Sequence, residues 1–197
     1  MRVKTLVGDD FKKSCRELSE TVVNEYRPDV VIGVLTGGGY VGREVSHHMK
    51  ASFNHLYTEI RIQRKNTEKK EKGIVHKTLQ SLPYFILNWL RMAEMLYEDV
   101  KAKKINPKRE GTVVFPNEVN CCLESGGKKV LIVDDAIDTG ATLKLVREAI
   151  LENFPDTTVK IAVVTVTSNH TLIDADYFLF HDRTLVRFPW SNDVKTK

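Results

Sequence analysis

Apolar residues along this chain follow two spacings, one typical of helices and the other typical of strands. Between Asp9 and Tyr26 they recur every three or four residues, which predicts an amphipathic helix that Pro28 ends. Elsewhere, short and continuous apolar runs rich in β-branched residues predict strands that are buried on both faces. These predicted strands are Val30–Leu35, Lys128–Asp134 and Val159–Val166.

The other patterned segments complete an alternation of strands and helices. Phe53–Ile62 alternates polar and apolar residues, as a strand with one exposed face does, and Tyr177–Phe180 is a shorter apolar strand. Helices are predicted at Tyr40–Met49, after a turn at Thr36–Gly39, and at Thr142–Asn153. The alternation predicts an α/β fold, an open and mainly parallel twisted sheet flanked by helices, with a small C-terminal part.

One long segment, at about 63–120, interrupts this alternation. Gln63–Lys72 is almost entirely charged and polar, which predicts either a solvated link or a flap that folds over bound substrate. Leu82–Ala102 has helical spacing with a stripe of aromatic and methionine residues, typical of core packing or a subunit contact. We therefore expect a single domain over residues 1–197, with a charged loop and a helical insertion at about 63–120.

The composition is that of an ordinary globular protein. The chain has 197 residues, of which 42% are hydrophobic and 28% charged, so it can bury a core without a disulfide or a metal. Its formal net charge of +4 permits anionic small molecules and does not require nucleic acid. We expect a cytoplasmic protein without a membrane partner, because a membrane-length apolar run, a secretory signal and a disulfide pattern are all missing.

The segment after Val133 carries the most chemical information. It reads Asp134-Asp135, then Asp138-Thr139-Gly140-Ala141-Thr142, and leads into a predicted helix. The N–H groups and positive dipole at a helix N-terminus form an anion site, and the threonine hydroxyls suit a phosphate monoester. The paired carboxylates suit the adjacent hydroxyls of a ribose, and also Mg²⁺, bound directly or through water. This segment therefore predicts a site for a phosphorylated sugar.

A glycine-rich loop follows the first buried strand and reads Thr36-Gly37-Gly38-Gly39. In open parallel sheets, ligands bind beyond the carboxyl ends of the strands, so we expect this loop and the acidic loop to face one site. Arg43, about one helical turn further on, either adds positive charge to that site or is an ordinary surface arginine.

The acidic segment resembles the PRPP-binding signature of the type I phosphoribosyltransferases, and the order of segments from about Val30 to Ser191 agrees with that family. The resemblance implies that Asp134 and Asp135 bind the ribose hydroxyls of PRPP and the metal. It implies a catalytic role for Asp138, as acid or base near N7 of a purine. The remaining implied contacts are, for the 5′-phosphate, Asp138, Thr139, Gly140, Ala141 and Thr142, and, for pyrophosphate, Thr36, Gly37, Gly38, Gly39 and Arg43.

The C-terminal part matches the purine branch of that family less closely. Hypoxanthine-guanine enzymes commonly place a lysine after the strand that corresponds to Val159–Val166, and this chain has Thr167-Ser168-Asn169-His170 there. Its ending is similar to that of xanthine- or hypoxanthine-type members. The base-binding residues implied by the resemblance are Ile137, Val186, Phe188 and Trp190. Trp190 alternatively closes the core beneath the last strand, and the identity of the base stays open.

The resemblance implies an enzyme that transfers the 5-phosphoribosyl group of PRPP to a nitrogenous base and releases pyrophosphate, in nucleotide salvage. It favours a 6-oxopurine (hypoxanthine, guanine or xanthine) as the base, Mg²⁺ as the cofactor, and a homodimer or larger homo-oligomer. The alternative is a regulator that senses PRPP or a nucleotide on the same fold without catalysis. Asp138 and the glycine triplet favour the enzyme, because a sensor has less need of a leaving-group site. A dinucleotide-binding oxidoreductase would need a GxGxxG motif, which does not follow the first strand.

Overall fold

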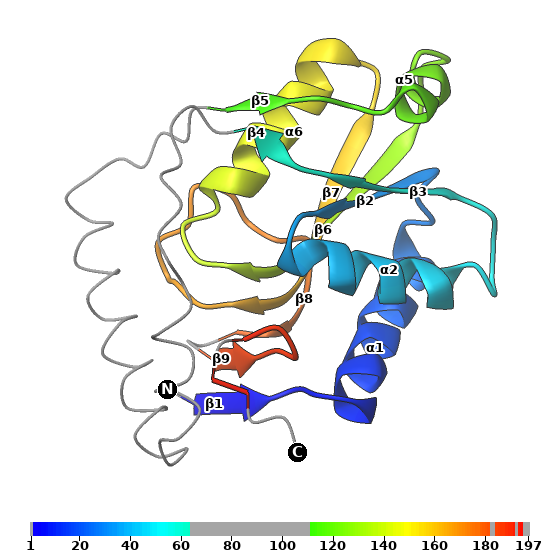
Figure 1. The fold of residues 1–197 in the computed structure, drawn as a ribbon. Helices are drawn as coiled ribbons and strands as arrows, with labels where there is room; N and C mark the ends of the chain where they lie inside the picture. Colours follow the sequence, from blue (N-terminus) through cyan, green and yellow to red (C-terminus); the bar gives the residue numbers. More distant parts are fainter. Residues whose placement is uncertain (1, 64–110, 182–183, 192, 195–197) are drawn as a thin grey trace.

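The computed structural model describes residues 2–63, 111–181, 184–191 and 193–194 (Figure 1). In chain order the elements are β1 (Arg2–Thr5), α1 (Asp9–Glu25), β2 (Val30–Val34), α2 (Gly37–Met49), β3 (Leu56–Ile60), β4 (Ile62–Gln63), β5 (Thr112–Val113), α5 (Asn117–Leu123), β6 (Lys129–Ile137), α6 (Ala141–Asn153), β7 (Thr158–Val166), β8 (Tyr177–Phe180) and β9 (Thr184–Arg187).

A five-stranded sheet with the order β3-β2-β6-β7-β8 forms the centre of the molecule. Each neighbouring pair in it is parallel, which confirms the predicted fold class. From β2 the chain moves to β3 on one side, whereas β6, β7 and β8 are added on the other side. The connections therefore diverge between β2 and β6, and in sheets of this kind ligands bind at that point, beyond the carboxyl ends of the strands.

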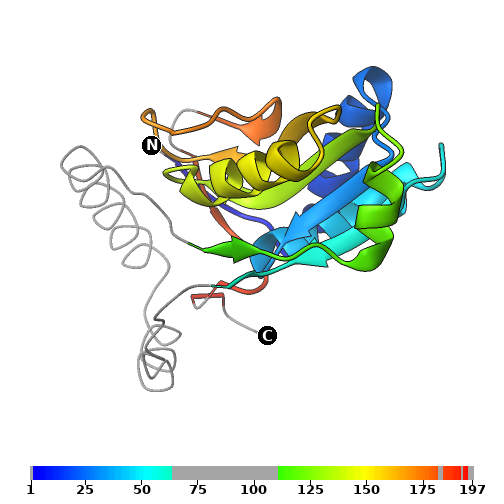
Figure 2. The same ribbon diagram turned by 90° about the horizontal axis from the view of Figure 1, so that it is seen from above.

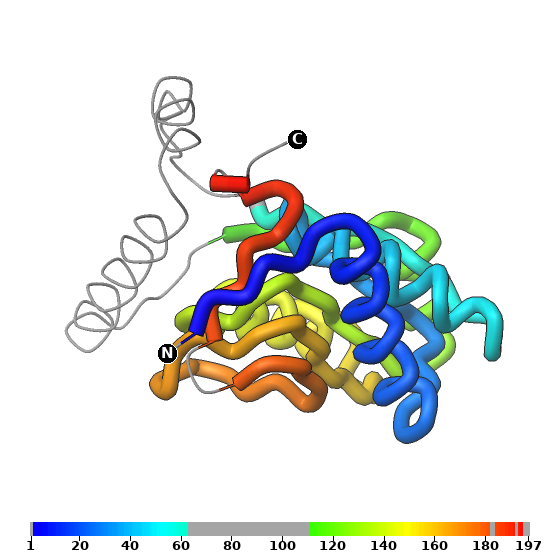
Figure 3. The backbone as a smooth tube through the Cα atoms, turned by 90° about the horizontal axis from the view of Figure 1, so that it is seen from below, coloured from blue at the N-terminus to red at the C-terminus, as the bar shows by residue number. Residues whose placement is uncertain are grey.

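The apolar runs of the central strands divide into two cores because successive side chains of a strand point to opposite faces. In β6, Leu131 and Val133 pack in a core with α1 and α2, whereas Val130 and Ile132 pack in a second core with α5 and α6. The sheet is thus the middle of three layers. Seen from above, α6 lies on the near side of the sheet (Figure 2), and seen from below, α1 lies on the near side together with β1 and the C-terminal segment (Figure 3).

Helix α1 shows how the predicted pattern becomes a packed element. Its apolar face is fully buried against the sheet at Cys15, Leu18 and Val22, and two acidic residues in the first turn suit the positive end of the helix dipole. The helix ends at Glu25, shortly before Pro28, as the sequence predicts.

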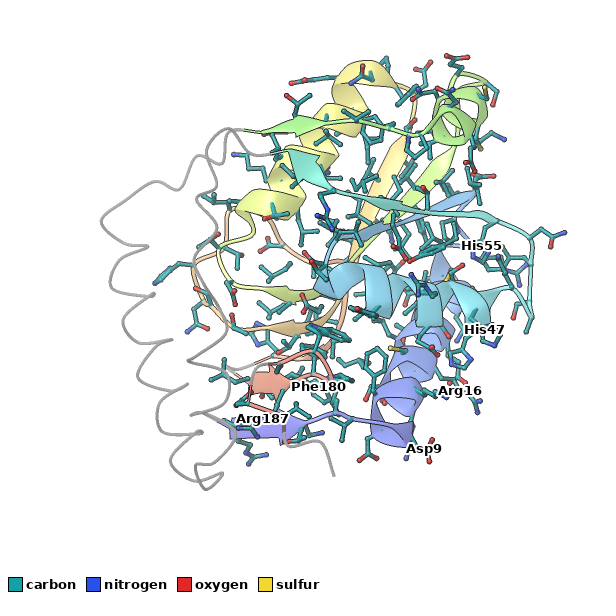
Figure 4. All side chains as sticks on the ribbon, viewed as in Figure 1. Asp9, Arg16, His47, His55, Phe180 and Arg187 are labelled. Carbon is teal, nitrogen blue, oxygen red and sulfur yellow. The ribbon has the colours of Figure 1, made fainter. Side chains whose placement is uncertain are left out.

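The two chain ends meet in a small parallel sheet in which β1 pairs with β9. Figure 3 shows the N-terminal strand running alongside the C-terminal segment. The side chain of Arg187 is buried there; its Nε donates to Asp193 at 2.8 Å and its Nη1 donates to Thr5 Oγ1 at 3.0 Å. Figure 4 shows Arg187 beside β1. The last strand is thereby fastened to the first one.

Three boundaries differ from the sequence-based predictions. The glycine triplet is not a turn before a helix, because α2 already begins at Gly37. The strand β6 does not end at Asp134 and continues to Ile137, since it keeps pairing with β7 through Ala136 and Ile137. Part of the expected insertion belongs to the sheet domain, because Val119 on α5 is fully buried in the α5–α6 core.

The predicted helix at Leu82–Ala102 lies outside the described residues, as does all of the predicted flap except Gln63. Gln63 is the second residue of β4, which pairs antiparallel with β5. Among the described helices, none has the length and apolar character needed to cross a membrane.

Candidate functional site

Two groups of predicted site residues, the acid pair and the glycine triplet, come together at the carboxyl ends of β2 and β6. The pairing of these strands ends at Gly33 and Val133, so β6 extends past its neighbour and carries Asp134 and Asp135 into the region beyond β2. The N-terminus of α2 follows β2 directly and lies against this extension, since α2 packs on both β2 and β6. The structure therefore places the acid pair and the glycine triplet side by side, as the sequence predicts.

The glycines allow this close approach because they have no Cβ. A Cβ on Gly37 would overlap the carboxylate of Asp135, and one on Gly38 would lie 2.7 Å from Asp134 Cα and 2.6 Å from the Val133 carbonyl oxygen. Any larger side chain would have to displace the acid pair or the strand. The first turn of α2 and the acid pair thus form one packed unit.

The acid pair is held in an environment that disfavours its charge. Burial, followed by the charge of Asp135, raises the pKa of Asp134 well above its ordinary value. Burial also raises the pKa of Asp135, although its contacts with the Asp134 side chain and the Trp190 indole oppose that rise. The charge of Asp138 raises both pKa values further. Two adjacent carboxylates in such a place suit a ligand that donates hydrogen bonds or carries positive charge.

Asp135 has a hydrogen-bond donor from the far end of the chain. Trp190 Nε1 donates to Asp135 Oδ2 at 3.1 Å. The indole ring stacks on Phe188 and on Tyr40, with both centroid distances at 4.9 Å. Because Trp190 also packs, partly buried, against the core with α1 and α2, the structure favours the alternative in which it packs in the core.

The second predicted loop, residues 138–142, forms the start of α6. Gly140 precedes the helix with φ 74° and ψ 1°, a left-handed conformation that suits glycine. The loop after β7 supports it from behind: Leu172 N donates to the Thr139 carbonyl at 2.8 Å, and a Cβ on Gly140 would lie 2.9 Å from Ile173 Cγ2. The predicted 5′-phosphate residues thus lie on a braced turn at a helix N-terminus, the geometry that binds phosphates.

Asp138, the predicted catalytic residue, is exposed at the start of this turn. Thr167 Oγ1 donates to Asp138 Oδ1 at 2.5 Å and also lies 3.1 Å from the Ile137 carbonyl oxygen. Thr167 thus fixes one carboxylate oxygen of Asp138. In the sequence, this threonine is notable only because it follows the strand after which hypoxanthine-guanine enzymes commonly have a lysine.

Arg43, which was predicted to contact pyrophosphate, forms an ion pair with Glu59. Its guanidinium lies 2.6 Å from Glu59 Oε1, and 62% of the side chain is exposed. The Tyr57 hydroxyl bridges the same carboxylate, at 2.9 Å, and the Gly39 carbonyl, at 2.8 Å. Arg43 therefore already has a carboxylate partner, and a role toward pyrophosphate would require it to share or leave Glu59.

The predicted base-binding residues do not form one group. Val186 and Phe188 are buried in the core with α1 and α2 and pack near Trp190. Ile137 is buried on the other side of the sheet, in the core with α5 and α6. The residues that would face a base therefore stay a prediction.

Magnesium fits the chemistry of the acid pair. Asp134 and Asp135 supply hard carboxylate oxygens, which Mg²⁺ prefers. Burial is the main cause of their raised pKa values, and a bound cation would favour their charged forms. The described residues contain no cluster of three or more histidine, cysteine or acidic side chains that would hold a metal alone. The site therefore suits an ion that takes its other ligands from a phosphorylated substrate and water.

Several residues of this site have no signal in the sequence pattern. Tyr40, Thr167, Leu172 and Ile173 reach the site through packing between segments that are distant in the chain. Trp190 was singled out by its place in the chain ending, but its hydrogen bond to a residue 55 positions away is visible only in the folded structure.

Comparisons with known proteins agree with this geometry. A family model described as "Phosphoribosyl transferase domain" matches residues 7–195. No curated protein matches the chain by sequence.

Among solved structures, the chain resembles a purine phosphoribosyltransferase from Pyrococcus horikoshii, with a TM-score of 0.59 at 21% identity over 97% of this chain and 95% of the other. It also resembles the xanthine-guanine-hypoxanthine phosphoribosyltransferase of Helicobacter pylori, with a TM-score of 0.60 at 16% identity over 96% and 94%. A third similar structure, from Neisseria gonorrhoeae, contains bound ppGpp and has a TM-score of 0.60 at 16% identity over 96% and 89%. Likeness at such identities establishes the shared fold.

Proposed function

This chain belongs to the phosphoribosyltransferase family, and from that premise we propose that it transfers the 5-phosphoribosyl group of PRPP to a 6-oxopurine and releases pyrophosphate. The observation that carries the proposal is the packing of Asp134 and Asp135 against the glycine start of α2, at the point where the sheet connections diverge. A ligand there would meet carboxylates, helix N-termini and glycine backbone within one site, and PRPP has a ribose, a phosphate and a pyrophosphate to match.

The assignment of PRPP groups follows the chemistry of each element. The ribose hydroxyls would donate to Asp134 and Asp135, whose carboxylates pair with no basic side chain among the described residues. The 5′-phosphate would bind the braced turn at residues 138–142, and the pyrophosphate would bind the backbone of Thr36–Gly39. When bound, Mg²⁺ would be held by Asp134 and Asp135 and would neutralise charge on the pyrophosphate.

The residues of the chain supply orientation and proton handling. Cleavage at C1′ separates a ribosyl group with cationic character from an anionic leaving group, so fixing the sugar at both ends lowers the barrier. Asp138 would hold or move the proton at N7 of the purine, with its carboxylate kept in place by Thr167. A position at the mouth of the helix turn keeps this carboxylate accessible to a base.

A purine acceptor is supported by the names of the similar structures and by the chain ending. Two of those structures are named as purine or xanthine-guanine-hypoxanthine phosphoribosyltransferases, and the Pro189-Trp190 pair is similar to the ending of such members. The proposal implies nucleotide salvage in the cytoplasm and a homodimer or larger homo-oligomer.

One observation supports the regulatory alternative. The similar structure from Neisseria gonorrhoeae holds ppGpp, a nucleotide with phosphates at both ends of its ribose. A chain that used this site for sensing would bind such a nucleotide and would not turn over PRPP.

A panel of bases separates the two functions. Purified protein is given PRPP and Mg²⁺ with hypoxanthine, guanine, xanthine, adenine, uracil or orotate, and pyrophosphate is measured. We expect release with at least one of the three 6-oxopurines, and release only with a pyrimidine would overturn the purine assignment. Calorimetric binding of ppGpp without pyrophosphate release from any base would establish the sensor instead.

A further inference from the structure

We propose that Trp190 is a positioning residue that holds the carboxylate of Asp135 against the first turn of α2, and thereby couples the C-terminal segment to the ribose half of the PRPP site. The inference rests on the proposed function for its consequence in catalysis. The contact itself is a feature of the fold, and the experiments below read the two separately.

The indole ring is fixed on several sides. It lies parallel to Phe188, with an interplanar angle of 3°, and nearly parallel to Tyr40, with an angle of 18°. Phe11 meets it edge-on, with the ring centroids 5.5 Å apart. An indole held in this way has one polar atom, Nε1, and that atom donates to Asp135. The direction of the N–H bond is therefore set by packing.

The turn that presents Trp190 is also fixed. Phe188 N donates to Ser191 Oγ and Ser191 N donates to the Phe188 carbonyl, both at 2.9 Å. The buried pair of Arg187 and Asp193 closes the segment on either side of that turn. Trp190 is thus presented by a braced turn, which is what a residue that orients another side chain requires.

Asp135 needs such a partner because its own surroundings favour neither charge nor a single orientation. Its carboxylate touches Gly37, and the acidic groups that act on it are Asp134 on the same strand and Asp138 on the next turn. From α2, the neighbouring side chains of Tyr40 and Arg43 bring a phenol, which stacks on Trp190, and a guanidinium, which pairs with Glu59.

Trp190→Phe tests this role because it keeps an aromatic ring in the stack and removes the N–H. We expect KM for PRPP to rise by roughly tenfold or more, as for loss of a hydrogen bond to a charged group, with little change in the unfolding temperature. A positioning role toward the ribose site affects PRPP binding more than turnover, so kcat at saturating PRPP should change much less than KM. His47→Ala, at an exposed position of α2, is the control and should leave KM and the unfolding temperature unchanged.

A double-mutant cycle separates positioning from general packing. If Trp190 acts through Asp135, Trp190→Phe has little further effect on PRPP affinity in an Asp135→Asn background. An equal loss in both backgrounds would show that the ring only supports the fold, and would overturn the proposal. An unchanged KM for PRPP in Trp190→Phe would overturn it as well.

Fluorescence tests the contact without turnover. The chain has two tryptophans, so Trp89→Phe leaves Trp190 as the sole indole reporter. We expect its emission to shift in Asp135→Asn, which replaces the carboxylate beside the indole N–H by an amide, and to stay unchanged in Asp29→Ala at the other end of the sheet. Equal emission with and without the Asp135 carboxylate would refute the contact, even if the chain bound no PRPP and the proposed function had failed.

Discussion

Aspartates lie at both ends of the central sheet, but their interaction partners differ. At the amino end, Asp29 accepts the backbone N–H of Lys129 at 2.8 Å and lies 4.0 Å from Lys128 Nζ. At the carboxyl end, Asp134 and Asp135 lie next to each other with Asp138 nearby, and in the described part of the chain no basic side chain pairs with any of them. The negative charge of Asp29 therefore has a basic side chain nearby, whereas the charges at the carboxyl end have none among the described residues.

Other polar groups at the amino end of the sheet also have hydrogen-bond partners. The Tyr26 hydroxyl lies 2.6 Å from the Thr158 carbonyl oxygen, and Lys160 Nζ donates to the Tyr177 hydroxyl at 2.9 Å. Burial raises the pKa of Tyr26, which keeps its hydroxyl protonated as a donor. The polar groups at the amino end therefore stabilise the fold. The acidic groups at the carboxyl end reduce stability until a ligand binds them, which is typical of functional sites.

The largest expected effect is at Asp138. Asp138→Asn removes the group that would manage the proton of the base while it keeps the shape of the side chain and its contact with Thr167. We expect kcat to fall by about 10²–10⁴-fold, the usual contribution of a general acid or base, with KM for PRPP little changed. Steady-state kinetics with the preferred base measures both constants, and turnover close to that of the wild type would show that the assigned role is wrong.

A slightly smaller loss is expected at Gly37. Gly37→Ala puts a Cβ where the Asp135 carboxylate lies, so the acid must move, and displacement of a substrate-binding group by about 1 Å costs on the order of 100-fold in rate. The measurement is kcat/KM for PRPP, together with the unfolding temperature. His47→Ala, at an exposed position of the same helix (Figure 4), is the control and should retain activity. A Gly37→Ala variant with full activity would mean that the acid pair is free to shift.

A third change should stabilise the protein. The pKa of Asp134 is raised in the folded state, so the folded state holds this proton more tightly than the unfolded state does. The stability of the ligand-free protein is then lost as pH rises from the ordinary aspartate range through the folded pKa, and it stays low above that. Asp134→Asn removes this loss, and we expect about 1 kcal/mol of added stability at neutral pH, or roughly 3 °C in unfolding temperature. Thermal unfolding against pH is the measurement, and an unchanged profile would contradict it.

The opposite sign is expected at the amino end. Asp29→Ala leaves the Lys129 N–H without its carboxylate acceptor, so the free energy of unfolding should fall by about 1 kcal/mol or less, with unchanged KM for PRPP. The same unfolding and kinetic assays apply. If Asp29→Ala and Asp134→Asn shift stability in the same direction, the contrast between the two ends is wrong.

The sequence predicts the sheet well because the central strands are long, apolar and covered on both faces. It predicts the ends of these elements less well, for reasons that involve the site. Asp134 and Asp135 have low strand propensity, and the strand continues through them because Asp134 pairs with Val163 and Ala136 with Thr165 on β7. The glycines are poor helix formers, and α2 nonetheless starts at Gly37 because only a residue without a Cβ fits against the acid pair.

The remaining misses concern partners that are far apart in the chain. The strands β1 and β9 have four residues each, and they pair although they lie near opposite ends of the sequence. No local pattern therefore predicts them. The contact of Trp190 with Asp135 likewise depends on a turn and a stack that form only when α2, β6 and the C-terminal segment are packed together. The acidic signature predicts which residues bind the ligand, and the fold adds which residues hold them in place.

Calorimetric titration of PRPP, in the presence of Mg²⁺, into the wild type and two variants tests the central claim most directly. If the acid pair at the carboxyl end is the ribose site, Asp134→Asn/Asp135→Asn binds PRPP at least about tenfold more weakly than the wild type, and Asp29→Ala binds it equally well. Equal PRPP affinity in the wild type and the double variant would contradict the claim.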